Sequence, residues 1–145
     1  MDKLLTLLTL QRQAQEAKTR AQFLHVIANE SRKLVPYRQM FIWSDHGLSL
    51  SLDKVSGNVL LDENSEAAIN LKALIRSQTF DAHEPKEKKQ KGSEETLTMM
   101  PISTHQDGIL GGMCLETENP LSAEEKEILK ELAFSYAPIF ALHAV

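Results

Sequence analysis

Residues 97–117 read LTMMPISTHQDGILGGMCLET, and this segment contains the clearest fold signal in the chain. Two apolar runs, Leu97 to Thr104 and Ile109 to Thr117, lie on either side of His105-Gln106-Asp107-Gly108. An Asp-Gly pair between two apolar runs is a strong signal of a β-hairpin. We therefore expect two antiparallel strands here. Gly111-Gly112 inside the second strand predicts a bulge or a close approach of another backbone.

An earlier hairpin is predicted by the same reasoning. Arg38 to Ser44 is apolar on both faces, as in a central strand, and Asp45-His46-Gly47 is a turn signal. Leucines at 48, 50 and 52 then alternate with polar residues, which indicates a half-buried partner strand. Val59 to Leu61 is a candidate for a further short strand.

The N-terminal segment, residues 1–34, predicts one long helix because good helix formers fill it and the first proline is Pro36. At 1.5 Å per residue, about 30 residues would span roughly 45 Å, more than a small domain needs. The surplus favours a homodimer formed through this helix; the alternative is a helix packed on its own sheet. The expected dimer residues form a narrow heptad seam: Leu7, Leu10, Ala14, Ala17, Ala21 and Leu24.

Two further helices are expected. One runs from Ser65 to Arg76, and the other begins at Ser122, where Glu125 completes a capping box. Pro138 should kink or end the last helix. Between them, residues 81–95 are rich in mixed charges and predict a mobile charged loop.

This order of elements predicts an α+β fold of one domain, residues 1–145: a central, mostly antiparallel, twisted sheet with the N- and C-terminal helices packed on one face. Loops between residues 56 and 95 would cover the other face. A small-molecule pocket could form there.

Composition narrows the classes of function. The net charge is −4 and no Lys/Arg stripe is interleaved with aromatics, so we expect no nucleic-acid partner. The hydrophobic fraction of 42% is typical of a globular domain, and no apolar run approaches the roughly 20 residues of a membrane helix. A single cysteine, Cys114, is consistent with a reducing compartment. We expect a cytoplasmic protein.

The predicted order, with Met100-Pro101-Ile102 entering a hairpin that returns as Gly108-Ile109-Leu110-Gly111-Gly112-Met113, resembles the GAF domain. The segment Leu121 to Leu129 is similar to the last GAF helix. A sensory or regulatory role is what this resemblance implies.

A narrower resemblance rests on Leu34-Val35-Pro36-Tyr37-Arg38-Gln39, Trp43, Val55-Ser56-Gly57 and Asp62 to Ser65. These segments resemble the cytoplasmic N-terminal GAF-like region of HlyD-type membrane-fusion proteins of secretion and efflux systems. The resemblance implies a membrane-anchored continuation of the chain and a place at the cytoplasmic face of the bacterial inner membrane.

Catalysis is not expected. Cys114 falls in mid-strand, where a buried inert thiol is favoured, and the five histidines are scattered without metal-site spacing. Some GAF-like proteins reduce free methionine sulfoxide, an alternative that requires a resolving partner for the reactive thiol. The sequence motifs of cyclic-nucleotide and bilin binding are missing, so no cofactor is identifiable.

A ligand pocket is predicted around Tyr37, Arg38, Trp43, Ser56 and Asn58, where Tyr37, Arg38 and Trp43 could hold a planar anionic molecule. In the alternative, Trp43 belongs to the core, Arg38 forms a surface ion pair, and Ser56 and Asn58 serve a turn. The function then becomes a structural dimerisation or docking module without a ligand.

Overall fold

The computed structural model describes residues 2–57, 60–90, 92 and 94–143. Its centre is a five-stranded sheet in the order β2-β1-β5-β4-β3, with every neighbouring pair antiparallel. The strands are β1 (Gln39–Asp45), β2 (Leu50–Val55), β3 (Lys86–Lys89), β4 (Thr96–Thr104) and β5 (Gly108–Thr117). Both predicted hairpins are therefore confirmed.

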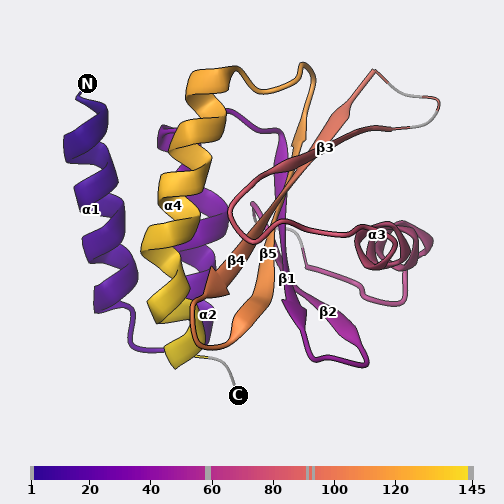
Figure 1. Cartoon of the computed structure of the whole chain (residues 1–145), viewed down its shortest axis with the longest axis horizontal. Helices are drawn as coiled ribbons and strands as arrows, with labels where there is room; N and C mark the ends of the chain where they lie inside the picture. Colours follow the sequence, from indigo (N-terminus) through magenta and orange to yellow (C-terminus); the bar gives the residue numbers. More distant parts are fainter. Residues whose placement is uncertain (1, 58–59, 91, 93, 144–145) are drawn as a thin grey trace.

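Helices cover both faces of the sheet, but unequally (Figure 1). On one face lie α1 (Lys3–Glu16), α2 (Arg20–His25) and α4 (Ala123–Leu142), while α3 (Glu66–Arg76) lies on the other. The predicted α+β class, with the terminal helices together on one face, is confirmed.

Strand alternation divides the core into two clusters. In β1, Met40 and Ile42 point into a large cluster beneath the three helices, whereas Trp43 points into a smaller cluster on the α3 side. Because neighbouring side chains of a strand point to opposite faces, an apolar run such as β1 must be central and covered twice.

The β4–β5 hairpin contains the irregularity that its glycines predict. Gly108 has φ +71°, as a tight turn requires. Ile102 pairs with Gly111 but Ser103 pairs with Ile109, which leaves Leu110 as the extra residue of a bulge.

The N-terminal segment is not the single helix that residues 1–34 predict. Helix α1 ends at Glu16, Ala17 is extended, and the Thr19 side chain accepts a hydrogen bond from the Gln22 amide to start α2. A π-helical turn, Val26–Glu30, and a 3₁₀ turn, Ser31–Lys33, follow. The break turns the chain back, so that one core buries apolar residues from both helices.

Because of this break, most residues of the predicted heptad seam pack in or against the chain's own core. Leu10 and Ala14 are fully buried and Leu24 nearly so, all in the helix-side cluster. Leu7 and Ala17 are half-buried, and only Ala21 is exposed. These residues are not a free face for a partner helix, contrary to the seam prediction; dimerisation itself stays a prediction.

Three other segments differ from expectation. Residues 81–95 contain a strand, β3, which pairs with Thr96–Met99 at the sheet edge. Leu60 and Leu61 are not in a strand, and Val59 lies outside the described residues. The last helix continues through Pro138 to Leu142, because Ile139 and Phe140 are buried in the core and hold its last turn in place.

The predicted start of α4 is confirmed: the Ser122 side chain accepts from the Glu125 amide, and the Glu125 side chain accepts from the Ser122 amide. Across the described ranges, none of the helices is both long and apolar enough to cross a membrane.

Candidate functional site

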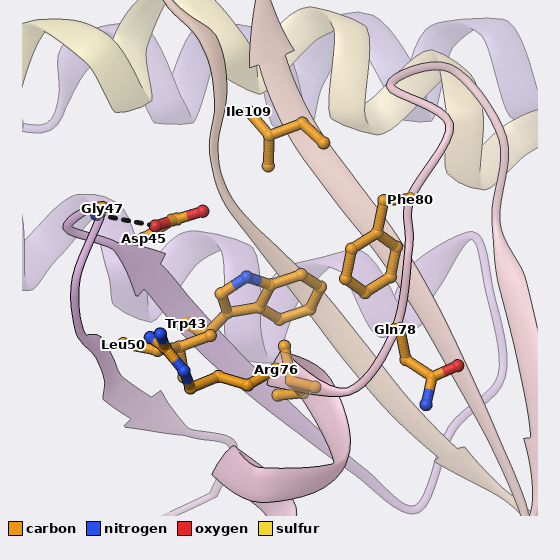
Figure 2. A pocket seen from close by; sticks show the side chains of 9 residues that line it. Trp43, Asp45, Gly47, Leu50, Arg76, Gln78, Phe80 and Ile109 are labelled. Carbon is orange, nitrogen blue, oxygen red and sulfur yellow. Dashed lines mark hydrogen bonds between the residues drawn. The ribbon is translucent and has the colours of Figure 1, made fainter.

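A cavity of about 270 Å³ opens on the α3 side of the sheet (Figure 2). Three segments distant in sequence meet there: the β1–β2 hairpin, the start of β5, and the end of α3 with the chain after it. The lining residues are Trp43, Asp45, Gly47, Leu50, Ile75, Arg76, Gln78, Phe80 and Ile109.

Two aromatic rings form one wall of this cavity. The Trp43 and Phe80 rings stack with centroids 5.6 Å apart and an angle of 27° between their planes. Trp43 is 1% exposed, so the indole is an anchored part of the sheet surface. A gap of 5.6 Å leaves no room for another ring between the two, and a ligand must lie against their edges.

Gly112 makes the position of the indole possible. Trp43 on β1 is the cross-strand partner of Gly112 on β5, so both point to the same face. A Cβ at residue 112 would overlap the Cζ2 and Cη2 atoms of the indole and lie 2.6 Å from the Met100 carbonyl oxygen. The close approach predicted for Gly111-Gly112 is therefore confirmed, and at Gly112 the group that approaches is the Trp43 ring.

Charged and polar groups lie at the cavity mouth. Figure 2 shows the Arg76 guanidinium and the Asp45 carboxylate on the hairpin side of the indole, with Phe80 and Gln78 on the other side. The Asp45 Oδ1 accepts a hydrogen bond of 2.8 Å from the Gly47 amide, which fixes the carboxylate over the turn. The Gln78 Nε2 donates to the Leu74 carbonyl at the end of α3.

The hairpin that contributes to this cavity is tied to the helix layer by a polar cluster. The Arg20 guanidinium at the start of α2 forms an ion pair with Asp53 on β2 and donates to the Ser44 hydroxyl at 3.0 Å. Ser44 and Ser51 both donate to the Asp53 carboxylate. A displacement of the hairpin would therefore also displace α2 or break these contacts.

A larger groove of about 740 Å³ lies between α4 and β4, bounded by residues such as Met100, Ser103 and Phe134. Its cation, Lys130, is already paired with Glu84 and Glu127. The smaller cavity is lined by two opposite charges, Asp45 and Arg76, neither of which forms an ion pair among the described residues, and it has a fixed aromatic wall. We therefore take it as the candidate ligand site.

The residues predicted to form the ligand pocket do not converge. Tyr37 is buried on the helix side, where its hydroxyl donates to the Ala28 carbonyl and Arg32 lies 4.8 Å from its ring. Burial raises the pKa of Tyr37 above its usual value. Arg38 is exposed and forms an ion pair with Glu95. Of the predicted set, only Trp43 lines the cavity.

Ser56 has a structural role: its hydroxyl accepts from the Met40 amide at 3.0 Å, which fastens the end of β2 to β1. Asn58 lies outside the described residues. Tyr37 and Trp43, six positions apart in sequence, are not brought together because they are buried in clusters on opposite faces of the sheet.

Cys114 and the candidate metal ligands complete the description of the reactive side chains. Cys114 is fully buried in β5, and burial raises the pKa of its thiol from 9.0 to about 12, so a nucleophilic thiolate is disfavoured. Among the described residues, no three His, Cys, Asp or Glu side chains are grouped to hold a metal ion.

Sequence reasoning missed Asp45, Arg76 and Phe80. By sequence, Asp45 belongs to a predicted turn, Arg76 to the end of a predicted helix, and Phe80 to no predicted element. None of them belongs to a motif, and only packing brings them beside Trp43. An isolated aromatic residue just after a helix, as at Phe80, is the one sequence signal that could have indicated a ring packed against the sheet at this cavity.

No family model and no curated protein matches this sequence. Solved structures do. A GAF domain of a phosphoenolpyruvate-protein phosphotransferase from Coxiella burnetii has a TM-score of 0.67 at 14% identity, covering 98% of this chain and 94% of that one. The GAF domain of the Acinetobacter phosphoenolpyruvate-protein phosphotransferase has a TM-score of 0.67 at 12% identity, with 98% and 95% covered.

A third GAF domain, assigned to a sensor histidine kinase of Pseudomonas syringae pv. tomato, has a TM-score of 0.59 at 15% identity, covering 93% of this chain and 83% of that one. At such identities the likeness concerns the fold. The chain has a GAF-like fold, as its hairpin and last helix predict. None of the three is described as a HlyD-type protein, so that narrower resemblance stays a prediction.

Proposed function

We propose that this chain is a non-catalytic regulatory domain that binds a small molecule in the cavity beside Trp43. The observation that carries the proposal is the meeting of a fixed aromatic wall, aliphatic side chains and two opposite charges at one opening. Small-molecule sites combine a mostly apolar lining with a few polar groups that fix orientation. Its buried cysteine argues against a thiol-based reductase.

The route by which binding would act on the rest of the molecule follows from the hairpin. Asp45 and Gly47 face the cavity, while Ser44 and Asp53 of the same hairpin hold Arg20. If the hairpin and α2 move together between two positions, a ligand that binds one position more tightly raises the population of that position. The size of the shift is set by the difference between the two affinities. The helix layer, on the opposite face, is then the output surface.

Trp43 provides the test because it is the only tryptophan in the chain. Protein purified under native conditions should release a bound small molecule in mass spectrometry, and adding that molecule back should change Trp43 fluorescence. Phe80→Leu should weaken this response, whereas Phe134→Leu, in the other groove, should leave it unchanged. Absence of any retained molecule, with fluorescence insensitive to a metabolite panel, would oppose the proposal.

A docking or dimerisation module is the second candidate, and the outer face of α1 favours it. Leu4, Leu5 and Leu8 are 62%, 61% and 48% exposed and lie within two turns of the helix. Apolar patches on a helix surface mark contacts with other proteins. We place the homodimer interface of this candidate here, in place of the buried seam.

Light scattering after size exclusion tests the dimer. The double change Leu5→Glu and Leu8→Glu should convert a dimer to a monomer, whereas Leu48→Glu, at a leucine 96% exposed in the β1–β2 turn, should not. A wild-type protein that is monomeric at high concentration would remove this candidate.

The setting of the domain is a further part of the proposal. The sequence resemblance supports the cytoplasmic region of a HlyD-type secretion protein, with a membrane-anchored continuation. Fractionation of cells that express the natural gene tests it: the domain should be found with the inner membrane and be protected from protease added outside. Recovery of the natural protein in the soluble fraction would contradict this setting.

A further inference from the structure

The two charges at the cavity mouth carry an inference about the ligand. Asp45 lies at the end of β1 and Arg76 at the end of α3, and both line the same cavity. Within the described part of the chain, neither takes part in an ion pair, with each other or with a third group. Opposite charges that share an opening without meeting leave a place for a ligand with both charges.

Each of the two charged groups suits a partner of defined chemistry. The Asp45 Oδ1 accepts from the Gly47 amide, and Oδ2 has no hydrogen-bond donor among the described residues. A carboxylate in this state suits an ammonium group. The Arg76 guanidinium offers a fork of N–H donors, which matches the two oxygens of a ligand carboxylate.

Beside the two charges, the side chain of Gln78 and the Gly47 backbone, the lining is aliphatic and aromatic, and the cavity is small. Leu50, Ile75 and Ile109 complete the cavity with the edges of the two aromatic rings. Its volume of about 270 Å³ lies below the roughly 300–1,000 Å³ of sites for drug-sized ligands. A nucleotide is therefore too large, and a molecule with a short aliphatic side chain fits.

We propose that this cavity takes a free apolar α-amino acid, with the ligand ammonium at Asp45, its carboxylate at Arg76, and its side chain against Leu50, Ile75 and Ile109. This inference rests on the proposed small-molecule function of the same site and specifies its ligand class.

The experiment uses three probes that differ by one charge. L-leucine carries both charges, 4-methylpentanoate lacks the ammonium, and 3-methylbutylamine lacks the carboxylate. Affinities for the full chain are measured by Trp43 fluorescence and calorimetry. L-leucine should bind at least about threefold more tightly than either analogue, the discrimination that a solvent-accessible ion pair provides.

Two variants assign the charges. Arg76→Gln should weaken L-leucine and 4-methylpentanoate but not 3-methylbutylamine, whereas Asp45→Asn should weaken L-leucine and the amine but not the acid. Matched controls are Lys72→Gln, on α3 but outside the cavity lining, and Asp81→Asn, whose carboxylate also accepts from a backbone amide two residues on. Neither control should change any affinity, and circular dichroism checks that all four variants fold.

Failures of the inference and of the function can be told apart. If native mass spectrometry identifies a different ligand at this cavity, or if both analogues bind as tightly as L-leucine, the amino-acid assignment is overturned and the sensing function stands. If the three probes fail to bind and no retained molecule is found, both are overturned.

Discussion

Replacing Gly112 by alanine tests the packing on which the candidate site depends. The added methyl would overlap the Trp43 indole and lie 2.6 Å from the Met100 carbonyl oxygen. Overpacking of this kind costs about 1–3 kcal/mol. For a chain of this length that corresponds to a Tm lower by about 2–12 °C. The indole should also be displaced toward solvent, with a red shift of its fluorescence.

A double-mutant cycle separates the indole from the backbone. Trp43→Leu removes the overlapping ring atoms, so Gly112→Ala should cost less in that background, with a coupling of about 0.5–3 kcal/mol. Gly111→Ala is the matched control, because its added carbon overlaps the backbone carbonyl of Trp43. Trp43→Leu leaves that carbonyl in place, so the cost of Gly111→Ala should not fall in the Trp43→Leu background. Unfolding in urea, followed by circular dichroism, provides all the free energies.

The reasoning is refuted if Gly112→Ala leaves both stability and fluorescence unchanged. The reasoning is also refuted if Gly112→Ala lowers the free energy of unfolding equally with Trp43 in place and in the Trp43→Leu background. The contact between Gly112 and the indole would then have no part in holding Trp43 beside the cavity.

Three other predictions follow from the same structure. The buried Cys114 thiol keeps its proton to a pKa of about 12 in the folded state, against 9.0 without burial. The unfolded chain therefore binds fewer protons above pH 9, and stability should fall with rising pH by up to about 1.4 kcal/mol per unit between pH 9 and 12. Cys114→Ala should have a shallower slope between pH 9 and 10 in urea titrations; an identical slope would contradict this. Asp53→Ala should lower the free energy of unfolding by about 1–3 kcal/mol, since it leaves the Arg20 guanidinium without its carboxylate. Hydrogen exchange should then show faster exchange of the α2 amides. Unchanged protection of these amides would mean that the Arg20–Asp53 ion pair does not hold α2 in place. Ser122→Ala removes one half of the α4 capping box and should cost about 1 kcal/mol by thermal unfolding; a loss below about 0.3 kcal/mol would show that tertiary packing alone holds this end.

Helix breaks show where local sequence signals mislead. Residues 1–34 contain neither proline nor glycine, yet Ala17 leaves the helix and Thr19 caps the next one. Pro138, by contrast, lies inside α4. In both places burial outweighs local preference: Leu10 and Leu24 reach one core only if the chain turns, and Phe140 is buried only if the helix continues.

The candidate site shows a similar limit. The sequence indicates Trp43 as a pocket residue and Gly111-Gly112 as a place of close approach, but the pairing of Trp43 with Gly112 depends on the strand order β2-β1-β5-β4-β3. Asp45 and Arg76 carry no motif, so nothing short of the folded chain brings them to one opening.

Elements with local signals could be predicted from the amino-acid sequence alone: two hairpins with their turn residues, a capped last helix, and a sheet covered on both faces. Turn geometry, strand alternation and capping each depend on a few consecutive side chains, which is why they can be read directly. Which residues share a face and a cavity could be read only from the folded chain, because these contacts depend on strand register and on how distant segments pack together. The position of Phe80 over the indole of Trp43 is such a contact.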